Sequence, residues 1–161
     1  MKLAWHYTVS IRAAGILSAG ELRPSTAFVP ASEIPIVWFS TRQHWEPTAN
    51  KALQNADGHR VPLDFDETIE YGGGGWRFGV AVDQLTPWRR LKLAAHISPD
   101  MAAGLVRAAK RCGADPSFWY GSLKPVRMSV CLIERLTDGR WIAATGGSCA
   151  ALRRTERPAV R

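Results

Sequence analysis

Short apolar runs separated by glycine- and proline-rich segments are the feature that most limits how this chain can fold. β-Branched and aromatic residues are typical of strands, and they are concentrated in four runs, at residues 2–9, 35–40, 76–82 and 126–132. Asp138-Gly139 predicts a tight turn through which the last run continues as a hairpin with residues 140–144.

Two segments carry helix signals. Residues 10–19 have apolar side chains at helical spacing and are followed by Gly20, a common C-terminal stop. The clearer helix starts after Ser98, an N-cap residue with proline at the next position, and runs to Gly113. Because helices and strands do not alternate regularly, the sequence predicts an α+β fold with a largely antiparallel or mixed sheet.

Length and charge predict one domain with a basic tail. A chain of 161 residues with 46% hydrophobic content suits a single core, which we place at residues 1–148. The net charge is +7, and the last nine residues, RRTERPAVR, contain four arginines and one glutamate. This end has few side chains that can pack, so residues 149–161 are predicted to be disordered. The remaining charge fits a polyanionic partner or an ordinary solvated surface.

The number and spacing of the cysteines and the hydropathy of the chain predict its cellular compartment. Cys112, Cys131 and Cys149 are odd in number and lack CxxC spacing, which predicts neither a disulfide framework nor a metal site. No apolar run reaches the roughly 18 residues of a membrane span, and the N-terminus lacks the apolar region of a signal peptide. These features predict a cytoplasmic protein with no membrane partner and no bound metal.

The first predicted strand carries a possible nucleotide-binding pair. Residues two apart on a strand point to the same face, so His6 and Thr8 lie side by side, with Tyr7 on the opposite face. An imidazole and a hydroxyl in this arrangement could hydrogen-bond the ribose hydroxyls or the amide of a nucleotide. The alternative for His6 is a partly buried side chain that is hydrogen-bonded to the backbone.

The second predicted strand ends in a cluster of polar side chains. In the segment PIVWFSTRQHWEPTA, residues 35–49, the strand ends at Ser40 and is followed by Arg42 and Glu46. A guanidinium matches the geometry of a phosphate, so Arg42 is a candidate ligand for a diphosphate. The structural alternatives are a solvated loop arginine and, for Glu46, a charge that caps a short helix starting at Pro47.

These two segments carry a resemblance to a known family. The stretch AWHYTVSIRAAGILSAGELRPS, residues 4–25, resembles the opening of ADP-ribosyltransferase-like folds, with His-x-Thr on a strand and a helix ending in Ile-Leu-x-x-Gly. Phe39-Ser40-Thr41-Arg42 matches the family's spacing between a strand-ending phenylalanine and an arginine. The resemblance covers about 45 residues and is closest to DNA-modifying ADP-ribosyltransferase toxins and RNA 2′-phosphotransferases.

The resemblance implies a specific fold and ligand. We expect an α+β domain in which a split pair of small mixed or antiparallel sheets, with a few short helices, surrounds a cleft for NAD, which serves as substrate. The side chains expected to bind it are His6, Tyr7, Thr8, Ser40 and Arg42. His6 and Thr8 would contact the nicotinamide ribose or amide, and Arg42 would pair with the diphosphate or orient the substrate.

The family uses a glutamate on a late strand to stabilise the positive charge that develops on the ribose. In this chain Val130-Cys131-Leu132-Ile133 occupies the corresponding stretch, and Glu134 follows two or four residues beyond the family's position. At about 3.3 Å per residue, that displacement is roughly 7–13 Å. Glu46 is the second candidate carboxylate, so the expected catalytic residues are Arg42, Glu134 and Glu46.

Three functions remain open. The first is an NAD-dependent ADP-ribosyltransferase that modifies DNA, RNA or protein. The second is RNA 2′-phosphotransferase chemistry, for which Arg42, Arg77 and Arg89 are the candidate phosphate ligands. The third is a catalytically degenerate module that binds a nucleotide or a partner without turnover.

Overall fold

The computed structural model describes residues 1–144. The predicted basic tail, residues 149–161, and the end of the predicted domain at residue 148 lie outside this range. Within it, no helix is both long and apolar enough to cross a membrane.

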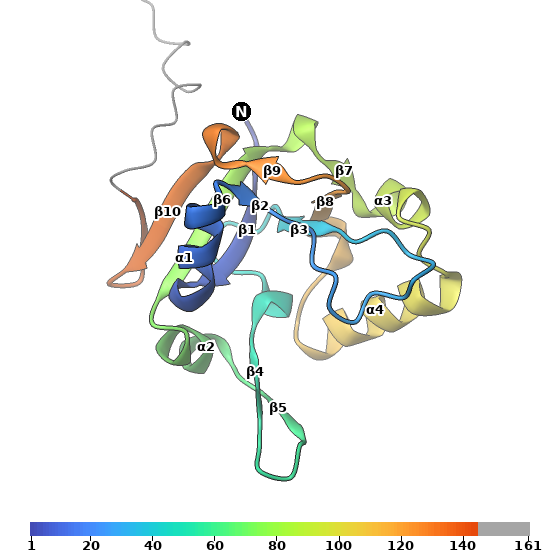
Figure 1. Ribbon diagram of the computed structural model, residues 1–161, viewed down its shortest axis with the longest axis horizontal. Helices are drawn as coiled ribbons and strands as arrows, with labels where there is room; N and C mark the ends of the chain where they lie inside the picture. The colour runs from blue at the N-terminus through green and yellow to red at the C-terminus, as the bar shows by residue number, and fades with distance from the viewer. Residues whose placement is uncertain (145–161) are drawn as a thin grey trace, which may run out of the picture.

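A seven-stranded antiparallel sheet with the order β11-β10-β6-β1-β3-β8-β7 organises the described chain (Figure 1). Its strands are β1 (Leu3–Val9), β3 (Val37–Ser40), β6 (Gly75–Ala81), β7 (Thr86–Pro87), β8 (Trp119–Ser122), β10 (Leu132–Thr137) and β11 (Arg140–Ala143). Two further antiparallel pairs are β2 (Glu21–Leu22) with β9 (Val126–Arg127) and β4 (Ala52–Gln54) with β5 (Arg60–Pro62).

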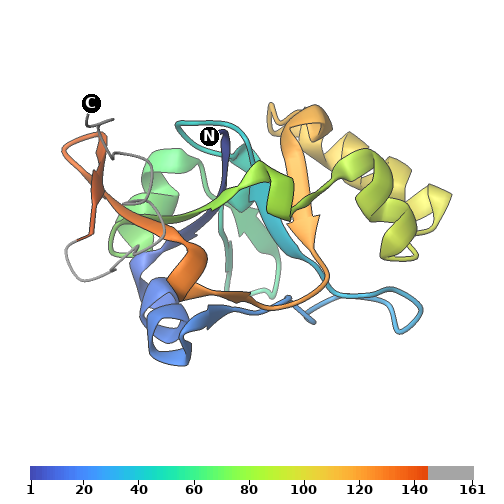
Figure 2. The same cartoon turned by 90° about the horizontal axis from the view of Figure 1, so that it is seen from above.

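Four α-helices lie around the main sheet in the described residues. They are α1 (Ser10–Ala19), α2 (Phe65–Tyr71), α3 (Trp88–Ala94) and α4 (Pro99–Arg111). Short 3-10 turns are η1 (Pro47–Ala49), η2 (Val82–Gln84), η3 (Pro116–Phe118) and η4 (Met128–Val130). In both ribbon views α3 and α4 lie at one end of the molecule and β10–β11 at the other (Figures 1 and 2). The predicted α+β class is confirmed.

The strands β1 and β3 pair over only a short length. β1 pairs with β6 over seven residues, whereas its pairing with β3 consists of the single register pair Trp5 with Ser40. The carbonyl oxygen of Trp38 lies 2.9 Å from Nδ1 of His6, so a side chain occupies an acceptor that could have extended the ladder. The resemblance predicts two separate small sheets; the structure instead has one sheet whose two halves meet at this point.

Alternating residues of β1 separate the two faces of the sheet. Ala4 packs in a core beneath α1 and β2, together with Phe78 and Val80 of β6. Trp5 and Tyr7 point to the other face, where Trp45 packs against them. A third cluster joins α3 and α4 to β8 and contains Trp88, Ala102, Ala109, Ala114 and Trp119. Each face of the sheet is therefore covered by different parts of the chain.

Local signals located several elements correctly. The helix predicted after Ser98 is α4, and the Ser98 hydroxyl accepts a hydrogen bond from the Met101 backbone N–H. The Asp138-Gly139 turn joins β10 to β11. The single strand predicted over residues 126–132 is wrong, because η4 interrupts it between β9 and β10.

Candidate functional site

A cleft of about 690 Å³ opens where β1 and β3 diverge. One wall is α4, which contributes Leu105, Ala108 and Ala109, with the C-cap residue Cys112. Another is the β4–β5 hairpin with its neighbour Leu63. The floor contains three aromatic side chains, Trp38, Phe39 and Trp119. Polar lining residues include His6, Ser40, Glu46, Thr48, Asn50 and Lys51. The cleft therefore brings together residues from both segments that carry the sequence resemblance.

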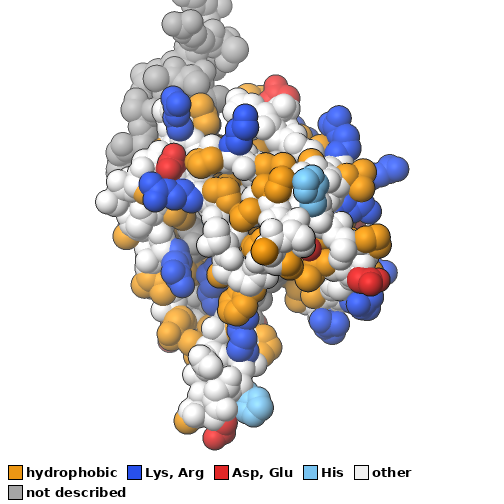
Figure 3. All heavy atoms as spheres, turned by 45° about the vertical axis from the view of Figure 1, so that its right-hand side comes forward, with side chains coloured by type: hydrophobic (Ala, Val, Ile, Leu, Met, Phe, Trp, Pro, Cys, Tyr) orange, Lys and Arg blue, Asp and Glu red, His pale blue; other side chains and the backbone are white. Residues whose placement is uncertain are grey.

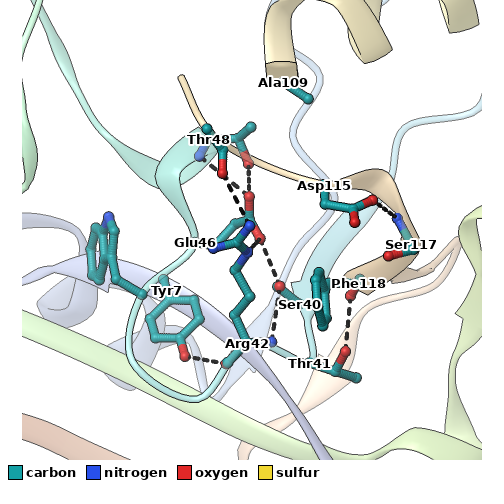
Figure 4. A network of polar contacts seen from close by, with 12 residues as sticks. Tyr7, Ser40, Thr41, Arg42, Glu46, Thr48, Ala109, Asp115, Ser117 and Phe118 are labelled. Atoms are coloured by element: carbon teal, nitrogen blue, oxygen red, sulfur yellow. Dashed lines mark hydrogen bonds and ion pairs between the residues drawn. The ribbon is translucent and has the colours of Figure 1, made fainter. Parts of the chain in front are cut away.

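Glu46 is a buried carboxylate held by neighbouring hydroxyl groups (Figure 4). Ser40 Oγ donates to Oε2 of Glu46 at 2.7 Å, and Thr48 Oγ1 donates to Oε1 at 3.0 Å. The Thr48 backbone N–H also lies 3.4 Å from Oε1, so Glu46 is the N-cap of η1 as well. The capping role expected as an alternative for Glu46 is confirmed, and the same side chain lines the cleft.

Arg42 lies beside this carboxylate without lining the cleft. Its Nε is 3.8 Å from Oε2 of Glu46, too long for a hydrogen bond, and its Nη2 donates to the carbonyl of Gly113 at 3.0 Å. The guanidinium carbon is 5.2 Å from the ring centroid of Phe118 (Figure 4). Arg42 therefore connects the loop after β3 to the segment that follows α4.

His6 is a neutral hydrogen-bonding group at the cleft. Burial lowers the pKa of His6 to about 4, with a smaller contribution in the same direction from the charge of Lys51. A carbonyl can only accept, so the contact with Trp38 O requires the proton on Nδ1. Nε2 then carries a lone pair that can accept a hydrogen bond from a ligand. The structural alternative for His6, a contact with the backbone, is thus present together with a place in the cleft lining.

Thr8 and Tyr7 have other surroundings. Thr8 is 3% exposed and is not part of the cleft lining. Tyr7 borders the cleft, but its hydroxyl donates to the carbonyl of Arg42 at 2.5 Å. Burial raises the pKa of Tyr7 to about 12, so the phenol stays protonated at neutral pH.

Three side chains of the sheet hold the loop between Ser40 and Glu46. Tyr7 of β1, Arg77 of β6 and Trp141 of β11 donate hydrogen bonds to three consecutive carbonyls, those of residues 42, 43 and 44. We call this set of donors the loop clamp. Because Glu46 lies two residues beyond the last of these carbonyls, the loop clamp restrains the main chain next to the buried carboxylate.

Glu134 binds Arg77, one of the three donors of the loop clamp. It pairs in register with Arg77 on β6, and Nε of Arg77 donates to its Oε2 at 2.6 Å. The Arg77 guanidinium carbon also lies 3.8 Å from the ring centroid of Trp5 and 4.6 Å from that of Trp141. Glu134 is not part of the cleft lining, so of the two candidate carboxylates only Glu46 borders the cleft.

Lys51 is a cleft residue that the sequence did not single out. Among the lining residues in the described chain it is the only lysine or arginine. It forms no ion pair within residues 1–144. Burial lowers the pKa of Lys51, and the nearby charge of Arg12 acts in the same direction. Nothing in the local sequence marks Lys51, because its place depends on the packing of the β4–β5 hairpin.

Comparison with known proteins does not assign the chain to a family. No family model, curated protein or solved structure matches it. In the described part of the chain, no group of three or more His, Cys, Asp or Glu side chains is arranged to hold a metal ion.

The cleft borders a strongly basic surface. The helices α3 and α4 and their connection carry six basic residues and one acidic residue, Asp100. The basic residues are Arg89, Arg90, Lys92, Arg107, Lys110 and Arg111, and none forms an ion pair in the described structure. Figure 3 shows Lys and Arg side chains gathered on the side where these helices lie. We call this set of six the helical basic surface.

Proposed function

We propose that the protein is an NAD-dependent ADP-ribosyltransferase. The observation that carries the proposal is that His6 and Ser40, which come from the two segments that resemble this family, line one cleft together with the carboxylate of Glu46. A volume of about 690 Å³ lies within the range of about 300–1,000 Å³ that is usual for small-molecule and cofactor sites. We further propose a cytoplasmic location, where NAD is available.

The polar groups have roles that suit the nicotinamide half of NAD. Nε2 of neutral His6 can accept a hydrogen bond from a ribose hydroxyl or from the carboxamide. Trp38 and Trp119, whose ring centroids are 5.8 Å apart, present aromatic surface on which the nicotinamide ring can pack. The segment resemblance supports this orientation of the ligand over the reverse one.

Glu46 is the carboxylate that we propose to act on the reacting ribose. In the reaction, the bond between ribose C1′ and the nicotinamide nitrogen breaks and its electrons leave with nicotinamide. The acceptor gives a lone pair to C1′ and loses a proton to water. A carboxylate that is held in place beside C1′ stabilises the positive charge in the transition state. Glu46 lines the cleft and Glu134 does not, which favours Glu46 for this role.

The helical basic surface supports nucleic acid as the acceptor. Its cations lack carboxylate partners in the described structure, and α4 also forms a wall of the cleft. A polyanion bound along these helices would lie close to the cleft and to the proposed reaction centre. A protein acceptor would not require a basic surface.

A binding module without turnover is the second candidate. The observation that favours it is that both oxygens of Glu46 already accept hydrogen bonds from Ser40 and Thr48. RNA 2′-phosphotransferase chemistry has less support, because no arginine lines the cleft in the described residues.

The test is incubation of the purified protein with NAD, followed by chromatography of free nicotinamide. Parallel reactions with labelled NAD contain DNA, RNA or a protein mixture. We expect nicotinamide release together with label on nucleic acid. Saturable NAD binding without release would instead support the binding module, and absence of both would overturn the proposal.

A further inference from the structure

We propose that Lys51 is the anion-binding residue of the cleft and that it binds the pyrophosphate group of a dinucleotide. The identity of that dinucleotide as NAD rests on the proposed function, but the anion site does not. The residue expected from the sequence to bind the diphosphate was Arg42, whose guanidinium is engaged by Gly113 and lies outside the cleft lining.

The backbone of Lys51 is fixed on both sides. Its N–H donates to Oγ1 of Thr68, a fully buried residue of α2, at 3.1 Å. Its carbonyl accepts a hydrogen bond from the N–H of Leu63 at 2.9 Å. Because the main chain is anchored to α2 and to the segment after β5, the side chain starts from a defined position on the cleft wall.

The charge of Lys51 has no protein counter-ion in the described structure. Glu46, the one carboxylate among the lining residues, is hydrogen-bonded to Ser40 and Thr48 instead. A partly buried ammonium group without a partner is costly, and an anion that enters the cleft would offset that cost. His6 is neutral, which leaves Lys51 as the positive charge of the lining.

The position favours a small phosphorylated ligand over a nucleic-acid backbone. Lys51 lies inside the cleft beside His6, whereas the six cations of the helical basic surface lie on α3, α4 and their connection. A pyrophosphate links two nucleosides, so a single cation on the cleft wall can bind it while the two nucleosides extend along the cleft. The aromatic floor is suited to one of the two bases.

The experiment measures binding by calorimetric titration with inorganic pyrophosphate, ADP-ribose, NAD and adenosine. The variant Lys51→Met removes the charge, and Lys51→Arg keeps it. Lys2→Met is the matched control, because Lys2 is exposed, lies outside the cleft lining and carries the same charge. Unfolding midpoints of all variants are measured in parallel.

We expect Lys51→Met to weaken pyrophosphate and ADP-ribose binding by about 10- to 100-fold, the usual effect of losing a charged hydrogen bond. Lys51→Arg and Lys2→Met should bind almost as the wild type does, and adenosine binding should not change. If Lys51→Met is unfolded, Lys51→Gln, which keeps a polar side chain, is judged by the same criteria.

The proposal is overturned if Lys51→Met binds pyrophosphate and ADP-ribose like the wild type, or if Lys2→Met is weakened equally. It is also overturned if the wild type binds neither compound. Its failure is distinguishable from that of the proposed function. Lys51-dependent binding without nicotinamide release would retain the anion site and refute the transferase. Release that is unchanged in Lys51→Met at low NAD would refute the anion site alone.

Discussion

Arg77 donates a hydrogen bond from Nε to Oε2 of Glu134 at 2.6 Å, and the same guanidinium donates to the carbonyl of Gln43 in the loop that leads to Glu46. The ion pair is largely buried, with side-chain exposures of 9% and 15%. Glu134 therefore orients the Arg77 guanidinium, and Arg77 holds the loop. Through this pair, Glu134 contributes to the stability of the loop that leads to Glu46, although Glu134 itself does not line the cleft.

Removal of Arg77 should strongly destabilise the protein. Arg77→Met leaves the Glu134 carboxylate buried without its partner, and we expect a loss of about 3–5 kcal/mol in the free energy of unfolding. Urea titration measures this loss. The control is Arg23→Met, which breaks the exposed pair with Glu21 and should cost at most about 1 kcal/mol. Equal effects of the two substitutions would show that the buried pair does not support the loop.

A turnover assay should distinguish the roles of the two candidate carboxylates. We expect Glu46→Gln to lower the rate of nicotinamide release by about 10²–10³-fold, as for the loss of one group that stabilises transition-state charge. Glu134→Gln should act mainly on stability, and its rate per folded molecule should stay near that of the wild type. The reverse order of effects would place the reacting ribose next to Glu134, as the sequence resemblance predicts.

His6 should make stability depend on pH. Its pKa is about 4 in the folded protein and near 6.5 when unfolded, so between these values the unfolded chain binds a proton that the native state does not. As far as His6 is concerned, the free energy of unfolding is highest above pH 6.5. It falls as the pH drops toward 4, by roughly 3 kcal/mol at most. Urea unfolding at pH 7.0, 5.5 and 4.5 measures it. The same loss in His6→Gln, with His59→Gln as control, would assign the dependence to other groups.

NAD binding should distinguish His6 from Thr8. His6 lines the cleft, so His6→Ala should weaken binding by about 0.5–1.5 kcal/mol, the usual cost of one neutral hydrogen bond. Thr8 is buried away from the cleft lining, and Thr8→Ala should leave the affinity unchanged. Fluorescence titration with NAD measures both. Equal weakening would mean that the ligand reaches the face of β1 beyond His6.

The helical basic surface should bind nucleic acid with a clear salt dependence. The variant Arg107→Ala/Arg111→Ala removes two cations and should lower the slope of log affinity against log salt by about two. Arg135→Ala/Arg140→Ala removes two exposed arginines from β10 and β11, at the other end of the molecule, and should have little effect. Anisotropy with labelled single- and double-stranded DNA and RNA provides the measurement. Equal slopes in the two variants would rule out a specific role for α3 and α4.

Features that depend on a few neighbouring residues could be predicted from the sequence. Alternation placed His6 and Tyr7 on opposite faces of β1, and the structure has Tyr7 on the face of the loop clamp. The Ser98 cap located the start of α4, and the Asp138-Gly139 turn located the last hairpin. These features were predictable because a cap, a turn or an alternating face involves neighbours that the chain itself keeps close.

The partners of the candidate site residues were decided by the tertiary structure. Glu134 meets Arg77 only because β10 pairs with β6 in one particular register, and a shift of one residue would place it on the other face. Lys51 reaches the cleft because Thr68 and Leu63 anchor its backbone from elements that follow it in the chain. The sequence by itself determined the segments that become β1, β3, β6, α1 and α4, and the polar side chains that β1 and the end of β3 carry. Whether Glu46 or Glu134 faces the cleft was determined by long-range strand pairing, since that pairing sets which surfaces are buried against one another.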